Sequence, residues 1–341
     1  MPSGRPLMPA AILNRAAALA VTLFGVAVVA FVLLRVAPGD PIAMMIGPGA
    51  SAHDIAALRA HYGLDGPMLF QFGIWLRAVA GGDFGSSITF HREVLGLVGE
   101  RLPATLELAV PAFALALQIG AGLAIVGTLH QRRPGETVID GFTGLLLAVP
   151  DFVWALTLLL VFGVAAPVFP LSGRTDPHLE TVFHTPFYLL ESVARGHWST
   201  ARDVAAHLAM PVLALALPLA AVVGRVLKEA LAEAMLQDYV LLARVKGFSE
   251  LRLVGREALR NAIGPTLALA GVQFTFLLGG TVIVERIFSY PGLGNLSIEA
   301  VVNRDLPLIQ GLVLVFGTMF VLTNLMVDIA IAGLNPKLRH G

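Results

Sequence analysis

The sequence has 341 residues, of which 56% are apolar and 13% are charged. Because so few charged side chains cannot cover a water-soluble globule, much of the surface must face lipid. Basic and acidic residues number 23 each, which excludes the strongly basic field of a nucleic-acid-binding protein. Cysteine is absent, which excludes disulfides and thiolate metal sites.

Six apolar stretches are long enough to cross a bilayer as helices, which need about 20 residues each. They cover residues 12–34, 103–129, 139–168, 204–227, 266–284 and 306–334. The first stretch exceeds the apolar core of a signal peptide and precedes a poor cleavage site, so we expect it to remain as a span. We therefore predict an all-α polytopic membrane protein with six transmembrane helices.

The distribution of Lys and Arg indicates which side of the membrane holds the termini, which an even number of spans places together. With both termini inside, the inner segments hold about 13 of the 23 basic residues in roughly 70 residues, against about 10 in roughly 125 outside. Both termini are therefore expected in the cytoplasm. Seven of the inner basic residues lie between the fourth and fifth spans: Arg225, Lys228, Arg244, Lys246, Arg252, Arg256 and Arg260.

The spans divide the chain into three expected parts. Residues 1–36 form an N-terminal transmembrane helix, residues 37–102 an extracytoplasmic loop, and residues 103–341 a five-helix core that contains the inner segment 228–265. Apolar residues between His53 and Val79 recur at helical spacing, with a break of Gly and Pro residues, and predict two short amphipathic helices. We expect these helices to cover the bundle rather than to contact substrate.

The inner segment predicts two helices joined by a tight turn. Gly247 permits the left-handed conformation at the end of the first helix, and Ser249 with Glu250 is in position to cap the second, which we expect to end before Pro265. An exposed helix pair with basic and apolar faces has the form of a docking element. A simple positively charged anchor is the alternative.

The chain lacks the residues that would let it bind ATP in a P-loop. That motif places Lys directly after Gly, and none of Lys228, Lys246 and Lys337 follows a glycine. If the protein pumps a substrate, energy must therefore reach it through contact with another protein.

The stretch DYVLLARVKG, which begins at Asp238, resembles the cytoplasmic loop signature of ABC importer permeases of the dipeptide, oligopeptide and nickel subfamily. Three further stretches resemble the same family: GDFGSSITFHREVLGLVGERLPATLELA from Gly82, the segment from Gly279 to Gly311, and VDIAIAGLNPKLR near the C-terminus. The resemblance covers nearly the whole chain. It implies the type I ABC importer permease fold.

In that family the loop signature, with a later proline that Pro265 matches here, marks the coupling helix, which lies in a groove of the ATPase subunit. The resemblance assigns this role to Tyr239, Ala243, Arg244, Lys246 and Gly247. Arg244 and Lys246 are expected to pair with acidic groups of the ATPase. Where the general permease motif has Glu-Ala, this chain has Leu241-Leu242.

The resemblance also implies the partners and the location. They are a second homologous permease, two ATP-binding subunits that hold ATP and Mg, and an extracytoplasmic substrate-binding protein. No cofactor is expected in this chain itself, and the location is the bacterial cytoplasmic (inner) membrane.

Ionisable residues at membrane depth are costly and therefore candidates for function. Asp151 lies in the third predicted span, where the family commonly has an uncharged residue after the proline. It either lines the translocation path and attracts a cation such as a peptide amino terminus, or caps the helix that restarts after Pro150. Glu285 is a second path candidate. Three neighbouring residues are candidates for an outer ion-pair cluster: Arg286, Arg304 and Asp305.

The expected function is the permease of an ATP-driven importer of di- or oligopeptides. Nickel or a metal chelate is an alternative substrate within the same subfamily, although the nine His show no ligand spacing and no metal site is expected. A gradient-driven transporter would show inverted repeats, and none is visible. An intramembrane enzyme would need more than the isolated Asp151 at membrane depth.

Overall fold

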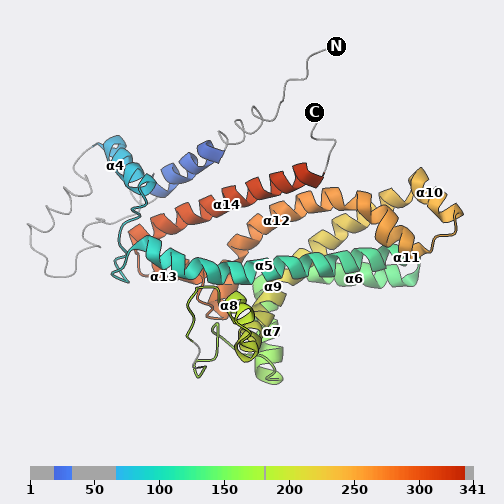
Figure 1. Ribbon diagram of the computed structural model, residues 1–341, viewed down its shortest axis with the longest axis horizontal. Coiled ribbons are helices and arrows are strands. Elements are labelled where there is room, and N and C mark those ends of the chain that lie inside the picture. Colours follow the sequence, from blue (N-terminus) through green and yellow to red (C-terminus); the bar gives the residue numbers. More distant parts are fainter. Residues whose placement is uncertain (1–18, 33–66, 180–181, 335–341) are drawn as a thin grey trace, which may run out of the picture. The chain divides into compact units, whose positions relative to one another are not determined.

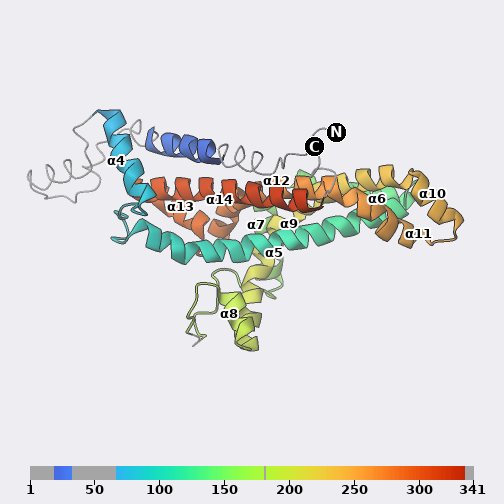
Figure 2. The same ribbon diagram turned by 45° about the horizontal axis from the view of Figure 1, so that its top comes forward.

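The computed structural model describes residues 19–32, 67–179 and 182–334, and these are mostly helical (Figures 1 and 2). In chain order the elements are a helix Leu19–Val32, α4 (Met68–Ala80), α5 (Val94–Leu129), α6 (Pro134–Ala148), α7 (Asp151–Leu158), the π-helical η1 (Leu159–Ala165), α8 (Tyr188–Ala194), α9 (Trp198–Met235), α10 (Asp238–Val245), α11 (Glu250–Arg252), the π-helical η2 (Leu253–Ala258), α12 (Leu259–Ile287), α13 (Leu293–Val302) and α14 (Leu306–Leu334). The described part has one isolated bridge, between Ser86 and Glu93, and no longer strand.

Four helices of the described part are long and apolar enough to cross a membrane, and they match the second, fourth, fifth and sixth predicted spans. They are Val94–Leu129, Trp198–Met235, Glu250–Ile287 and Leu306–Val327. The bent pair of α6 and α7 makes a fifth if it is one span. In the first predicted span, residues 19–32 form an apolar helix and the rest lies outside the described residues. These helices agree with the expected all-α membrane fold and are consistent with six spans.

The third predicted span is broken rather than straight, because α6 and α7 meet at an angle of 97°. Proline disfavours a helical conformation in the residue before it, and Val149 is accordingly extended, with φ −97° and ψ 118°. Pro150, with φ −58° and ψ 153°, then precedes the first residue of α7, Asp151. The bend therefore places a charged residue at a corner of the chain.

The fifth span is longer than predicted. The helical run continues from Glu250 to Ile287, so the expectation that a second inner helix ends before Pro265 is wrong. A proline removes one backbone hydrogen bond, but membrane helices tolerate this loss where neighbouring groups compensate for it. α12 is therefore continuous with the segment that follows the inner turn.

The chain forms two compact units, and the first comprises residues 1–99 with residues 297–322. Here the ring of Phe31 lies 5.2 Å from that of Phe72 and 5.6 Å from that of Trp75 on α4. α4 is the second of the two predicted loop helices; the first lies outside the described residues. The first part of the last span, up to Leu322, thus groups with the N-terminal region rather than with the five-helix core that the sequence predicts.

The second unit comprises residues 100–296 with residues 323–341, and α9 is its central helix, in contact with α6, α7, α8 and α12. α5 crosses α9 where two glycines let the backbones touch. A Cβ on Gly120 would lie 2.8 Å from the carbonyl oxygen of Ala220, and one on Gly224 would lie 3.1 Å from that of Gly120. Small residues at such crossings hold membrane helices together. Both views show α10 and α11 at one end of α9 and α12 (Figures 1 and 2).

Candidate functional sites

α10, the helix that carries the loop signature, is anchored by one face. Val240 is 0% exposed and Ala243 is 8% exposed. Both belong to a hydrophobic cluster that joins α10 to the ends of α5, α9 and the α11–α12 run: Ala124, Leu227, Leu231, Ala234, Val240, Ala243, Leu253, Val254, Ala258 and Ala262. A displacement of α10 must therefore displace the helices on which it packs.

The opposite face of α10 is apolar and exposed. Successive helical residues turn by about 100°, which places Leu241, Leu242 and Val245 opposite the buried pair. Their exposed fractions are 54%, 56% and 81%. A cluster of exposed apolar side chains on a helix outside the spans is typical of a surface that docks another protein. We call these three residues the α10 face.

The turn after α10 ends the helix through Gly247, as the sequence predicted. Gly247 has φ +82°, in the left-handed region that favours glycine. The amide of Phe248 donates to the carbonyl of Ala243 at 3.3 Å, and that of Gly247 donates to Arg244 at 3.0 Å, which completes a Schellman motif. Ser249 begins the next helix, but its side chain makes no capping hydrogen bond.

The two cations of the loop signature have different surroundings. Arg244 forms a two-point ion pair with Glu250 across the turn, with Nε to Oε1 at 2.9 Å and Nη2 to Oε2 at 3.1 Å. Its guanidinium therefore closes the turn, and its pairing with an acidic group of the ATPase stays a prediction. Lys246 is exposed, with no ion pair among the described residues, and Tyr239 is 39% exposed beside them.

Asp151 occupies the first position of α7, directly after the break. Its Oδ1 accepts a hydrogen bond from the amide of Phe152 at 2.7 Å, which is a local, cap-like contact. Its Oδ2 faces α12, where a Cβ on Gly280 would lie 3.1 Å away. No cation pairs with this half-buried carboxylate within the described ranges.

Glu285, the second path candidate, is completely buried at 0% exposure. Its Oε1 accepts from the hydroxyl of Thr105 at 2.8 Å and its Oε2 from the amide of Asn295 at 3.1 Å, in the first turn of α13. A Cβ on Gly292 would overlap this carboxylate. In this structure Glu285 thus caps α13 and does not line an open path.

The charges proposed as an outer ion-pair cluster have neutral partners instead. Arg286 donates to the side-chain oxygen of Asn295 at 3.3 Å. Asp305 is buried and accepts from the hydroxyl of Ser87 at 2.5 Å and from the amide of Leu308 at 3.2 Å. Arg304, at φ +53°, ends α13 in the left-handed conformation. Neither Arg304 nor Asp305 forms an ion pair within its own unit among the described residues, and Asp305 serves as the cap of α14.

A buried ion pair that was not among the predicted site residues joins α5 to the segment before α8. The guanidinium of Arg174 lies 2.7 Å from the carboxylate of Glu107, and the two side chains are 6% and 4% exposed. Arg174 also donates to the carbonyl of Pro186 at 2.6 Å and lies 3.8 Å from the ring centre of Tyr188. The second oxygen of Glu107 accepts from the amide of Leu189 at 2.8 Å. Nothing in the sequence linked Glu107 to Arg174, because 67 residues separate them.

A second carboxylate organises the same segment from α8. Glu191 accepts hydrogen bonds from the amide of His184 and from the amide and hydroxyl of Thr185, and it pairs with Arg195 at 3.2 Å. These contacts lower the pKa of Glu191 to about 2, and the hydrogen bond from the amide of His184 is the largest cause. Burial opposes the shift. Since its pKa is about 4.5 without these contacts, the stabilisation they provide is complete above pH 4.5 and is lost as the pH falls toward 2.

These features define a class: a membrane-spanning protein with a short helix, α10, whose outward face is apolar and exposed. No group of three or more His, Asp or Glu that could hold a metal ion occurs among the described residues. The chain belongs to the family of binding-protein-dependent transport system inner membrane components, whose model matches residues 116–340, and the model of the N-terminal region of such components matches residues 8–109. It is therefore the permease component of a transport system.

Two relatives illustrate the similarity over nearly the full length. The chain is 35% identical to the di/tripeptide transport system permease protein DppB of Pseudomonas aeruginosa over 323 residues, 94% of this chain and 95% of the relative. It is 34% identical to the glutathione transport system permease protein GsiC of Salmonella choleraesuis over 329 residues, 96% of this chain and 98% of the relative.

Proposed function

We propose that the chain is a permease of an ATP-driven importer and forms the translocation path for di- or oligopeptides. The observation that carries this proposal is the full-length similarity to permeases of di/tripeptide and glutathione transport systems. Both of those substrates are short peptides. The relatives' names do not favour the alternative of nickel or a metal chelate.

The α10 face supports a role for partner ATPases. In the proposed assembly this chain pairs with a second homologous permease, and two ATP-binding subunits hold ATP and Mg. An extracytoplasmic binding protein delivers the peptide. The apolar α10 face docks on an ATPase, and the cluster behind Val240 and Ala243 passes its movement to the spanning helices.

The distribution of basic residues supports an orientation with both termini in the cytoplasm of a bacterium and the chain in its inner membrane. In this orientation α10 lies on the cytoplasmic side, where ATPases are found. The segment between η1 and α9, with the buried pair of Glu107 and Arg174, then lies on the outer side.

Co-purification from native membranes tests the assembly. We expect a second permease and ATP-binding subunits to accompany this chain, and the purified complex in proteoliposomes to take up radiolabelled dialanine only with ATP and the binding protein. A chain that purifies alone and accumulates dialanine under an ion gradient would instead be a secondary transporter. Uptake of nickel but not of any peptide would reject the proposed substrate.

Asp151 is the residue we propose for the path, where its free oxygen attracts the amino terminus of a peptide. Asp151→Asn keeps the size and removes the charge, so we expect the KM for peptide uptake to rise about tenfold, as one lost charge-assisted contact predicts. The binding protein is a separate chain, and its affinity for the peptide should not change. Asp83→Asn, at an exposed loop carboxylate that accepts only the amide of Gly85 among the described contacts, is the control. An equal KM in both variants would leave Asp151 with its capping role alone.

A further inference from the structure

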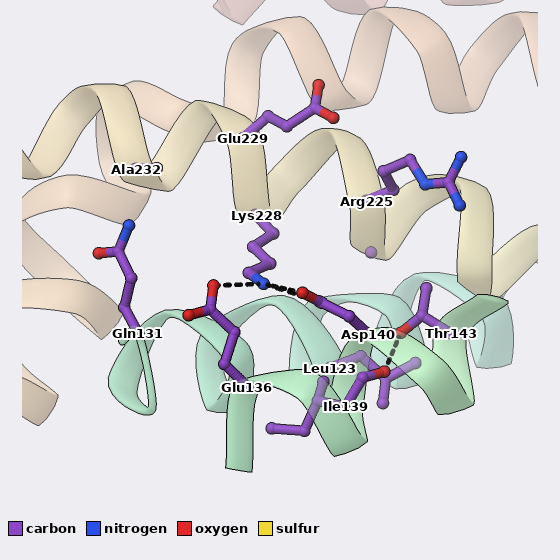
Figure 3. A pocket seen from close by; sticks show the side chains of 11 residues that line it. Leu123, Gln131, Glu136, Ile139, Asp140, Thr143, Arg225, Lys228, Glu229 and Ala232 are labelled. Atoms are coloured by element: carbon purple, nitrogen blue, oxygen red, sulfur yellow. Dashed lines mark hydrogen bonds and ion pairs between the residues drawn. The ribbon is translucent and has the colours of Figure 1, made fainter. Parts of the chain in front are cut away.

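An open cavity of about 430 Å³ lies between α5, α6 and α9, at the end where α9 leads into α10. Figure 3 shows Lys228 reaching across it from α9 toward two carboxylates of α6. The Nζ atom of Lys228 lies 2.9 Å from Glu136 and 2.7 and 2.8 Å from the two oxygens of Asp140. One ammonium group thus binds two acids that are one helical turn apart.

The surroundings hold Lys228 in this position. Its aliphatic stem crosses α5 at Gly127, where a Cβ would lie 3.3 Å from the Cδ atom. Glu136 also accepts the amide of Arg132 at 2.7 Å and so ties the start of α6 to the α5–α6 turn. Arg225, one turn earlier on α9, lines the same cavity but points away from both carboxylates (Figure 3). α6 and α9 also pack directly on each other, and within the described residues the ion pairs between them at this cavity are made by Lys228.

The two helices joined by this contact lead to the two sites described above. Lys228 lies seven residues before the end of α9 at Met235, about 10 Å along its axis, and α10 begins three residues later at Asp238. Asp140 precedes Val149 and the break before Asp151 by nine residues, about 14 Å along α6. Movement of α10 displaces α9 through their shared hydrophobic cluster. A link from α9 to α6 would carry that movement to the corner that holds Asp151.

We propose that Lys228 is a positioning residue for transport: it clamps α6 to α9, so that movement of the docking helix α10 is carried to the break before Asp151. We call Lys228, Glu136 and Asp140 the α6–α9 clamp. The clamp remains closed through the transport cycle. Its three side chains are partly exposed, so they add little to folding stability and act by fixing which helices move together. Without the ammonium group, two like charges lie one turn apart on α6 with no cation between them, and α6 follows the movement of α9 less closely.

The proposal rests on the proposed importer function, and proteoliposomes of the whole complex separate the two. For Lys228→Met we expect ATP hydrolysis to persist while dialanine moved per ATP falls about fivefold, in the range of coupling through packed networks. Arg225→Met removes one positive charge from the same cavity and should keep the wild-type ratio. If the wild type does not couple uptake to ATP, the importer function fails. If the wild type couples uptake to ATP hydrolysis and Lys228→Met moves as much dialanine per ATP, the clamp is rejected.

A charge exchange distinguishes the clamp from a role in folding. Asp140→Lys with Lys228→Glu keeps the net charge and places an ammonium group between two carboxylates again. We expect this double variant to recover most of the transport ratio, while either single change lowers it. A double variant that is no better than the single variants would overturn the proposal.

A cross-link tests whether the clamp stays closed. The chain has no cysteine, so Asp140→Cys with Lys228→Cys provides one unambiguous pair. A short bifunctional thiol reagent then replaces the lost ion pair with a covalent link. Restored uptake per ATP is the expected result. If the link blocks uptake, or leaves the ratio as low as before, the contact does not transmit movement in the closed state and the proposal is wrong.

Discussion

Arg174→Met is expected to lower the free energy of unfolding by about 3–5 kcal/mol, the cost of leaving a buried charge without its partner. Methionine keeps the length and apolar stem of the side chain, but the carboxylate of Glu107 loses its cation at 2.7 Å in a site that water hardly reaches. The carbonyl of Pro186 and the ring of Tyr188 lose their contacts with the guanidinium as well. Thermal unfolding of the purified complex in lipid nanodiscs measures the change.

Arg195→Met is the matched control for this prediction. Arg195 also pairs with a glutamate, Glu191, but its side chain is 42% exposed, so we expect a loss below about 1 kcal/mol. Adding Glu107→Gln to Arg174→Met removes the unpaired charge and should recover part of the stability. Equal stability of Arg174→Met and Arg195→Met would contradict the view that the buried pair holds the segment before α8 to α5.

Leu242→Asp combined with Val245→Asp is expected to weaken binding of the ATPase subunits by about 100-fold or more, since apolar anchors at the centre of an interface carry most of its binding energy. The two side chains are 56% and 81% exposed in the free chain, so the substitutions should leave its folding stability nearly unchanged. In the complex, however, each would bury a carboxylate against an apolar groove. Titration of the purified permease pair with the ATPase subunits gives the affinity.

Val182→Asp provides the control, because Val182 is 77% exposed but lies in the segment before α8, far along the chain from α10. It should leave ATPase binding intact. If the α10 double variant binds the ATPase as tightly as the control, the α10 face is not the docking surface. The charged residues beside it, above all Lys246, would then be the next candidates.

Local patterns in the sequence predicted the elements well wherever a single stretch determines the outcome. A stretch of about 20 predominantly apolar residues gives a spanning helix, as in α5, α9 and α14, because such a helix satisfies its own backbone groups in lipid. Gly247 ends α10 in the left-handed conformation because glycine adopts it without strain. The loop signature likewise located α10 from consecutive residues of the sequence alone.

The prolines show where local patterns are insufficient. Pro150 stands at a 97° corner, whereas Pro111, Pro218 and Pro265 lie inside continuous helices. The same residue type therefore gives different results, because neighbouring helices decide whether the freed backbone groups find partners. The break before Asp151 could not be distinguished in advance from a kink within one span.

The sequence by itself determined the class of protein, its family and the position of the helix that carries the loop signature, since these depend on composition and on consecutive residues. The tertiary structure decided which charges meet. Arg174 pairs with a glutamate 67 residues away, Lys228 with an aspartate 88 residues away, and Asp305 with a serine 218 residues away. Hydrogen bonds and ion pairs act over a few ångströms, so only the packing of the helices selects their partners.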